Sequence, residues 1–332
     1  MRILSVDGGG YLGLAIASFL QAVEQRFGTT AAAPFDLFCG TSTGAIIALA
    51  LAAEKTATEV VGLYEQLGPS VFTPPDPKAS RFKRAKEFCR RVKEARYDNE
   101  PLRAALDGVF GPLTLGDLRL AGKRVLITAF SVSTGGPRIF KTDHAPELVL
   151  HDRYRLTDVA LASSAAPTYL PLVEIVDPVS GILERFCDGG VVTNSPALLG
   201  YAEAISTLEC QPADVGILSL GTPRNDLAER PTALAPAQIP LNRGFQGWKF
   251  GEQIISITMD GGSKVSHFAL DRIAKAAGAC YVRVDMTAPP GVGLDIATPE
   301  ATLALRQLGT HCGRDTQTLA RVAPFFTREE VR

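Results

Sequence analysis

The stretch from Phe35 to Ala50 constrains the fold of this chain more than any other, because it joins three kinds of local structure. It opens with a short apolar run, 35–39, which predicts a buried strand. The turn Gly40-Thr-Ser-Thr-Gly44 follows, and its glycines leave no Cβ to crowd the serine. Residues 45–53 are then an almost unbroken series of strong helix formers. Strand, G-x-S-x-G and helix in this order predict a nucleophile elbow at Ser42; the alternative is an ordinary turn between two core elements.

A second glycine-rich turn, Asp7-Gly8-Gly9-Gly10-Tyr-Leu-Gly13, joins the strand-like residues 2–6 to a predicted helix over 14–27. Its letters match the dinucleotide fingerprint G-x-G-x-x-G. That fingerprint needs an acidic residue at the far end of the second strand, whereas Asp36 stands at the start of that strand. The mismatch argues against a nicotinamide cofactor. The loop is then expected to be a nest of backbone N–H groups for an anion, including the oxyanion of acyl transfer.

A third element is the acid-glycine sequence in Arg185-Phe-Cys-Asp188-Gly189-Gly190. Most Asp-Gly pairs are surface turns. Here the preceding run is apolar and Asn194-Ser-Pro196 leads into another predicted helix. We therefore expect Asp188 at a sheet edge, facing the crevice in which α/β enzymes bind their ligands. Its strand and the strands before the two glycine turns are expected to bring the three motifs together at the carboxyl ends of a parallel sheet.

These three motifs, in this order, resemble the patatin-like phospholipases. The supporting segments are also similar to that family: Ala162-Ser-Ser-Ala-Ala-Pro-Thr-Tyr-Leu-Pro171, Asn194-Ser-Pro196 and Leu218-Ser-Leu-Gly-Thr222. The resemblance covers about residues 1–222, with residues 223–332 expected as a C-terminal elaboration packed on the same domain. Lys141, Tyr97-Asp98 and Leu102 resemble the bacterial branch of the family.

The resemblance implies a three-layer α/β/α fold with a mainly parallel central sheet. It implies a lipid acyl hydrolase that uses a Ser–Asp dyad, with Ser42 as nucleophile and Asp188 as base, and no cofactor. The glycine loop would be the oxyanion hole, formed by Gly8, Gly9 and Gly10. One departure is Leu12, where the family usually carries Arg or Lys, although backbone N–H donors do not depend on that side chain.

Composition excludes several other classes of protein. Lys plus Arg number 34 against 35 Asp plus Glu, a net charge of -1, so nothing indicates a nucleic-acid partner. The six cysteines show no metal-ligand spacing, so we expect no metal, and a reduced cytoplasmic protein. No apolar run reaches the roughly 18 residues of a membrane span, and the N-terminal residues do not resemble a secretory leader.

The histidines bear on a competing mechanism, the Ser-Asp-His triad of a hydrolase or thioesterase. Only His267 and His311 follow Asp188; the first lies in a predicted helix and the second in a predicted turn after a helix. Neither has the loop setting of a triad histidine, which favours a dyad. His144 and His151 precede Asp188 in a polar stretch and are expected to be solvated.

The segment 81–96 is strongly basic with interleaved apolar residues, and predicts an amphipathic helix. Such a helix binds anionic lipid headgroups or a nucleotide, or is simply a solvated face. The candidate contacts are Arg84, Arg90, Arg91 and Lys93. Together with the resemblance, this segment suggests peripheral membrane association and a bacterial antiviral effector that is activated by a cyclic nucleotide. A non-catalytic phosphate- or nucleotide-binding module remains the alternative.

The remainder of residues 223–332 is predicted from pattern alone. A helix is expected over 244–277, with Trp248 and Phe250 as apolar anchors, and a strand over 281–285. Residues 303–319 are predicted to be helical, and the last dozen residues are expected to fray.

Overall fold

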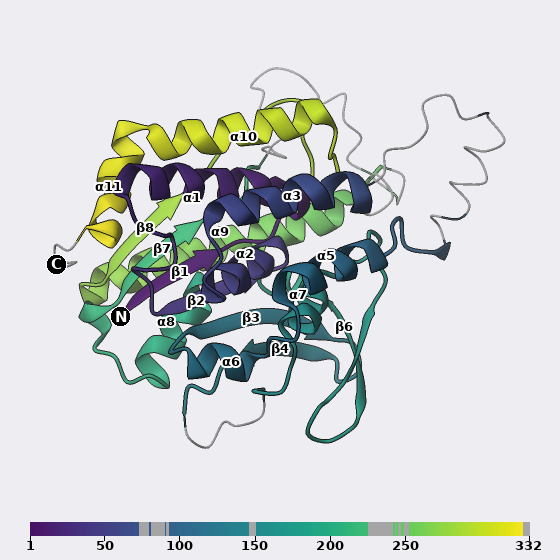
Figure 1. The fold of residues 1–332 in the computed structure, drawn as a ribbon, viewed down its shortest axis with the longest axis horizontal. Coiled ribbons are helices and arrows are strands. Elements are labelled where there is room, and N and C mark those ends of the chain that lie inside the picture. The colour runs from purple at the N-terminus through teal and green to yellow at the C-terminus, as the bar shows by residue number, and fades with distance from the viewer. Residues whose placement is uncertain are drawn as a thin grey trace.

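A single sheet runs through the molecule (Figure 1). The computed structural model describes residues 1–72, 80, 90, 93–145, 151–224, 242, 244, 247–248 and 252–327. Its strands are β1 (Arg2–Val6), β2 (Leu37–Thr41), β3 (Arg124–Ser131), β4 (Gly136–Lys141), β5 (Val173–Val176), β6 (Leu183–Asp188), β7 (Gly216–Leu220) and β8 (Cys280–Val284). They lie in the order β5-β6-β3-β2-β1-β7-β8, and β4 also pairs with β3.

The centre of the sheet is parallel and one end is antiparallel. β3, β2, β1, β7 and β8 pair with their neighbours in parallel. β4 and β6 both run antiparallel to β3, and β5 runs antiparallel to β6. The expected mainly parallel α/β/α fold is confirmed. The strand that carries Asp188 was expected to be parallel like the others, and this detail is wrong, because β6 enters the sheet through a hairpin with β5.

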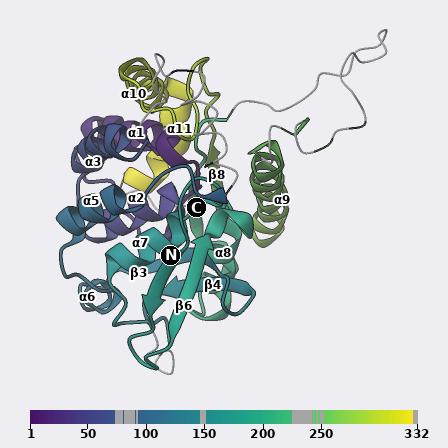
Figure 2. The same cartoon turned by 90° about the vertical axis from the view of Figure 1, so that its right-hand side faces the viewer.

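Helices cover both faces of the sheet, as Figure 2 shows. The longer helices are α1 (Gly13–Phe27), α2 (Thr43–Ala52), α3 (Ala57–Val71), α5 (Glu100–Phe110), α6 (Leu115–Leu120), α7 (Leu156–Ser164), α8 (Ala197–Ser206), α9 (Glu252–Ala277), α10 (Pro299–Arg314) and α11 (Thr316–Phe326). Short 3₁₀ turns are η1 (Gly10–Leu12), η2 (Gly189–Val191) and η3 (Pro212–Asp214). One face packs on residues of α8 and α9, and the other on the remaining helices.

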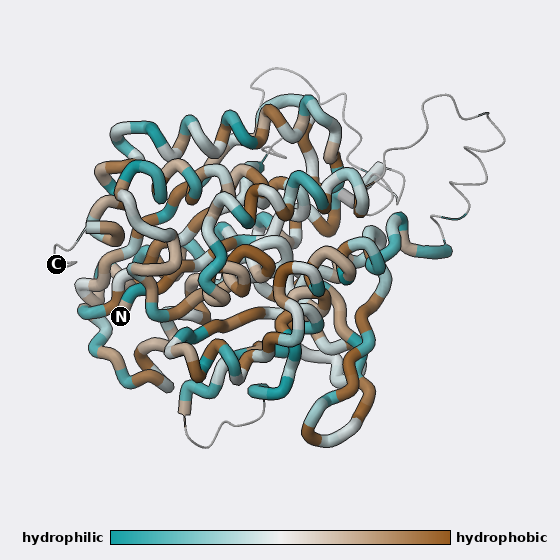
Figure 3. Tube along the Cα trace, viewed as in Figure 1, coloured by the Kyte–Doolittle hydropathy of each residue, from teal (hydrophilic) through white to brown (hydrophobic). Residues whose placement is uncertain are grey.

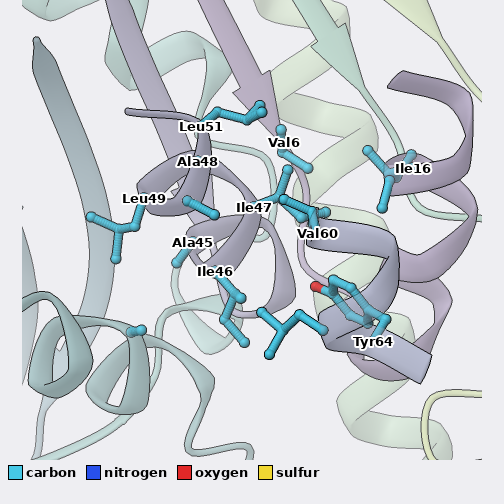
Figure 4. Packing of buried hydrophobic residues seen from close by; sticks show 14 of the residues in the cluster. Val6, Ile16, Ala45, Ile46, Ile47, Ala48, Leu49, Leu51, Val60 and Tyr64 are labelled. Carbon is cyan, nitrogen blue, oxygen red and sulfur yellow. The ribbon is translucent and has the colours of Figure 1, made fainter. Parts of the chain in front are cut away.

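Helix α2 lies at the centre of the larger core. It is apolar on all sides and every residue from Thr43 to Ala52 is buried, as expected for a helix with no solvent face. Figure 4 shows its side chains packed among Val6 of β1, Ile16 of α1 and Tyr64 of α3. The helix that follows Ser42 is therefore fixed from every direction.

The C-terminal third joins the same sheet and the same core. β8 extends the sheet beyond β7, and α10 packs against α1. A Cβ on Gly309 of α10 would lie 2.0 Å from the carbonyl oxygen of Ala15, so glycine there permits the two helices to approach closely.

Several predicted boundaries differ from the structure. The strand expected at 35–39 is β2, 37–41; Phe35 instead stacks on Phe325 of α11, with ring centroids 5.9 Å apart. The helical stretch expected over 303–319 is two helices, because Asp315 is extended and caps α11 by accepting a hydrogen bond from the Thr318 N–H. Residues 321–326 are helical rather than frayed, since Phe325 is buried. Trp248 lies in a turn before α9, and Phe250 lies outside the described residues.

Candidate active site

The predicted elbow is formed as the sequence indicates. β2 ends at Thr41, α2 begins at Thr43, and Ser42 between them has φ 54° and ψ −125°, a conformation that L-residues rarely adopt. A Cβ added at Gly40 would lie 2.4 Å from the carbonyl oxygen of Gly44. A Cβ added at Gly44 would lie 2.1 Å from the carbonyl oxygen of Val6. The two glycines are thus required by close packing of the turn against itself and against β1.

The backbone of Ser42 is held by a residue from α7. Its N–H donates a hydrogen bond to the hydroxyl oxygen of Ser163 at 2.8 Å, and the Ser163 hydroxyl donates to the carbonyl of Thr128 at 2.6 Å. Ser163 therefore ties the elbow to Thr128 within β3. Sequence reasoning singled out the segment 162–171 only as a family landmark, and this contact gives the landmark a physical role.

Asp188 stands at the end of β6 and is buried, with 1% of its surface exposed. Its Oδ1 accepts a hydrogen bond from the Gly190 N–H at 2.7 Å, whereas Oδ2 has no hydrogen-bond partner in the described part of the chain. Burial raises the pKa of Asp188 to about 6, and the nearby Ser42 hydroxyl and the Gly190 N–H offset only part of that rise. Asp188 is therefore more basic than an ordinary aspartate and still largely ionised at neutral pH.

The glycine loop is clamped at its first residue. The Gly8 N–H donates to the carbonyl of Asn194 at 3.1 Å, and the Gly8 carbonyl accepts from the Thr222 hydroxyl at 2.6 Å. Within the described residues, the N–H groups of Gly9 and Gly10 have no hydrogen-bond acceptor. The expectation that Gly8 also donates to an oxyanion is therefore not supported, because its N–H is already engaged. The contacts of Asn194 and Thr222 with Gly8 give a physical role to the segments Asn194-Ser-Pro196 and Leu218-Ser-Leu-Gly-Thr222.

A buried ion cluster anchors the residue that precedes this loop. Asp7 is fully buried and accepts two hydrogen bonds from Arg283 of β8, at 3.0 and 2.7 Å. It accepts a third from Arg224 at 2.6 Å. Neither arginine was singled out from the sequence, because partners 217 and 276 residues away leave no local signal.

Ser42, Asp188 and Gly10 line one pocket. Most of its other lining residues are apolar and come from α3, α5, the segment after α7, and α9: Leu67, Val71, Leu102, Leu170, Ile255 and Met259. The site thus brings Ser42, the buried carboxylate of Asp188 and a glycine of the loop together in the lining of an apolar pocket. An apolar chain attached to a reactive carbonyl fits this arrangement.

The four histidines lie away from this pocket. His267 of α9 hydrogen-bonds the Tyr281 hydroxyl at 2.8 Å, and His311 is exposed within α10 rather than in the turn expected after a helix. His144 was expected to be solvated and is buried, since its Nδ1 contacts Glu203 at 2.8 Å. His151 is also largely enclosed, and burial lowers its pKa to about 4.

The basic segment is only partly described: Arg84 and Arg91 lie outside the described residues. Arg90 is exposed and bonds to the carbonyls of Ala95 and Arg96, and Lys93 is exposed. Neither lines the Ser42 pocket.

The structure describes no group of side chains suited to a metal ion, and none of its described helices is long and apolar enough to cross a bilayer. Asp36 accepts a hydrogen bond from the Arg2 N–H before β2 begins, far from a ribose-binding position.

The sequence of this chain is similar to those of known proteins. Residues 4–200 match the sequence model of the family described as patatin-like phospholipase. The chain is 34% identical to a cGAMP-activated phospholipase of Pseudomonas aeruginosa (strain BWHPSA011 / Pa011), over 94% of this chain and 88% of the relative. It is 35% identical to one of Vibrio cholerae (91% and 86% covered) and 30% identical to one of Escherichia coli (91% and 84% covered), both of the same name.

Proposed function

Because this chain belongs to the patatin-like phospholipase family and is a lipid acyl hydrolase, we propose that Ser42 and Asp188 are its catalytic dyad. The observation that carries the proposal is that a strained serine, a buried carboxylate with one open oxygen, and Gly10 line the same apolar pocket. An alcohol is a weak nucleophile until a base takes its proton, and Asp188 is the ionisable base of that pocket.

The proposed reaction begins with attack of Ser42 Oγ on the ester carbonyl, while Oδ2 of Asp188 accepts the hydroxyl proton. Oδ1 stays bonded to Gly190, which keeps the carboxylate in place. The oxyanion that forms is stabilised by the N–H groups of Gly9 and Gly10, which have no acceptor within the described residues. Asp188 then protonates the leaving alcohol, and in the second half of the reaction it activates the water that cleaves the acyl-serine ester.

The acyl chain of the substrate occupies the apolar part of the pocket in this proposal. Val71 of α3, Leu102 of α5 and Met259 of α9 contribute apolar side chains from three helices to its lining. Binding by such a wall discriminates weakly between chains that differ by one methylene, by about 1 to 3 kcal/mol at most. We therefore expect the enzyme to accept acyl chains over a range of lengths.

We also propose that the enzyme meets its lipid at a membrane surface through the β5–β6 hairpin. Val176, Val179 and Ile182 are 58, 56 and 63% exposed near its tip. The hairpin is continuous with the site at both ends: Leu170, which lines the pocket, precedes β5, and β6 ends at Asp188. Exposed apolar side chains of this kind insert into the interfacial region of a bilayer.

Control by a cyclic nucleotide is proposed from the relatives. Three bacterial relatives that align over most of this chain are named cGAMP-activated phospholipases. We propose that a cyclic dinucleotide likewise activates this enzyme. Fatty-acid release from mixed phospholipid vesicles, measured with and without cGAMP, tests this directly; equal rates would reject it. A role in antiviral defence stays a prediction.

A fluorophosphonate probe tests the dyad, because only an activated serine is labelled. The wild type is expected to label at Ser42, identified by peptide mass spectrometry, whereas Ser42→Ala should neither label nor hydrolyse esters. Labelling at another serine would reject the assignment. Absence of both labelling and hydrolysis in the wild type, with and without cGAMP, would favour the non-catalytic binding module.

A further inference from the structure

Helix α9 has a face that the rest of the described chain leaves uncovered. It runs from Glu252 to Ala277 and, as Figure 2 shows, stands at the edge of the molecule. Its inner side contributes Leu270 to the core beneath the sheet and Met259 to the Ser42 pocket. The outer side is exposed along its length, although a helix with one solvent face normally carries polar residues there.

Apolar side chains form a stripe along that outer side. Ile254, Ile257, Val265 and Phe268 are 48, 46, 69 and 62% exposed. At 100° per residue they fall, with Gly261, within an arc of about 80°. The spacing of 3, 4, 4 and 3 residues is that of a helix seam which packs against another helix.

Gly261 lies in the middle of this stripe, with Gly262 beside it. Glycine within a helix costs about 0.5 to 1 kcal/mol relative to alanine. Nothing lies within 4 Å of a Cβ added at either position, so packing inside the chain does not require a glycine there. A stripe with small residues at its centre lets a second backbone approach from outside.

The stripe is symmetric about Gly261. Ile254 and Phe268 lie seven residues on either side of it, and Ile257 and Val265 lie four residues on either side. We propose that α9 packs antiparallel against α9 of a second copy of this chain, with a two-fold axis beside Gly261. Ile254 of each copy then meets Phe268 of the other, and Ile257 meets Val265, which makes the surface self-complementary.

The exposed area of the stripe indicates how stable such a pair can be. From their exposed fractions, the four apolar side chains offer on the order of 400 Å² per copy, about half the area per partner of a standard interface. Residues beside the stripe must supply the rest, so we expect a dimer whose population depends on concentration.

A disulfide at the symmetry centre tests the proposal, which does not depend on the proposed reaction. In an antiparallel pair residue 261 meets itself, so Gly261→Cys should form a disulfide-linked dimer under mild oxidation that dithiothreitol reverses. Gly108→Cys is the matched control, because Gly108 is also an exposed helical glycine with open space around it, on α5. Linkage of Gly261→Cys no faster than the control would overturn the pairing.

A second variant tests the same interface without a cysteine. Phe268→Glu should raise the dimer dissociation constant at least about tenfold in analytical ultracentrifugation, because two charges replace apolar contacts. Its circular dichroism and its hydrolysis of a soluble short-chain ester should match the wild type at the same protomer concentration. A wild-type protein that stays monomeric at tens of micromolar, while Phe268→Glu loses binding to phospholipid vesicles, would assign the stripe to lipid and overturn the proposal.

Discussion

Ser163 accepts a hydrogen bond from the backbone N–H of Ser42 at 2.8 Å while its own hydroxyl donates to the carbonyl of Thr128 at 2.6 Å, which links the elbow to a residue of β3 that lies 86 positions after Ser42. Both bonds are buried. A turn with φ 54° at a non-glycine residue persists only where its surroundings hold it. Ser163 therefore positions the proposed nucleophile, although it does not itself line the pocket proposed to hold the substrate.

Ser163→Ala should destabilise the protein by about 1 to 3 kcal/mol, because it leaves the buried N–H of Ser42 without its acceptor. Turnover should fall on the order of ten- to a hundredfold as Ser42 Oγ loses its position. Ser164→Ala is the control for urea denaturation, since the buried Ser164 hydroxyl has no partner among the described residues. Equal stability of the two variants would contradict the role of Ser163.

Asp188→Asn should raise the stability of the protein while lowering its activity. The pKa of Asp188, about 6, lies above the ordinary aspartate value of 3.8, so the folded state binds more protons than the unfolded state between those values. The ionised carboxylate therefore costs stability above pH 6, and that cost disappears below about pH 4. We expect turnover to fall about 10²- to 10⁴-fold. The free energy of unfolding should rise at pH 8, on the order of 2 kcal/mol, with no rise at pH 4. A loss of stability at pH 8 would contradict the burial argument.

The pH dependence of the wild type follows from the same group. A base must be unprotonated, so kcat/KM on a soluble ester should fall as pH drops through about 6 and stay flat from pH 7 to 8. His267→Ala and His311→Ala should keep this profile. A profile that either substitution abolishes, in a folded variant, would indicate a triad histidine.

Leu102→Trp should shift preference toward shorter acyl chains, because Leu102 lines the pocket from α5 and the larger ring fills part of it. A series of p-nitrophenyl esters measures the effect: hydrolysis of the acetate should change little and that of the longest chains should fall most. A uniform loss across the series would mean that the substitution disturbs the fold instead.

Replacing Val179 and Ile182 together with Glu should weaken sedimentation with phospholipid vesicles by roughly tenfold or more, since each buried apolar side chain contributes about 1.5 to 3 kcal/mol. Hydrolysis of a soluble ester should be unchanged. Leu303→Glu is the comparison, because Leu303 of α10 is exposed and lies outside both the hairpin and α9. Unchanged vesicle binding in the double variant would remove the hairpin from the membrane contact.

The sequence predicts the site well where its residues are close together in the chain. The elbow around Ser42 and the loop after β1 each combine strand, glycine turn and helix within about 20 residues, so local pattern is enough. The antiparallel direction of β6 was missed, because strand composition does not encode direction. The roles of Arg224 and Arg283 were missed for a different reason: each meets Asp7 only through the folded sheet.

Boundaries were predicted least well where tertiary contacts replace local preference. Phe35 has the composition of a strand residue, but stacking on Phe325 draws it out of β2. The same contact keeps α11 helical to Phe326, where the sequence suggested fraying. In both cases the deciding partner is about 290 residues away, beyond the reach of any local pattern.

The contacts that hold the glycine loop also limit when the site can form during synthesis of the chain. Gly8 to Gly10 are synthesised before Thr222, Arg224 and Arg283, the residues that hold the loop and Asp7. A nascent or prematurely ended chain can form β1, β2 and the elbow without those partners. Such a product holds an unbraced loop, so a chain that ends before Thr222 is expected not to hydrolyse lipid esters.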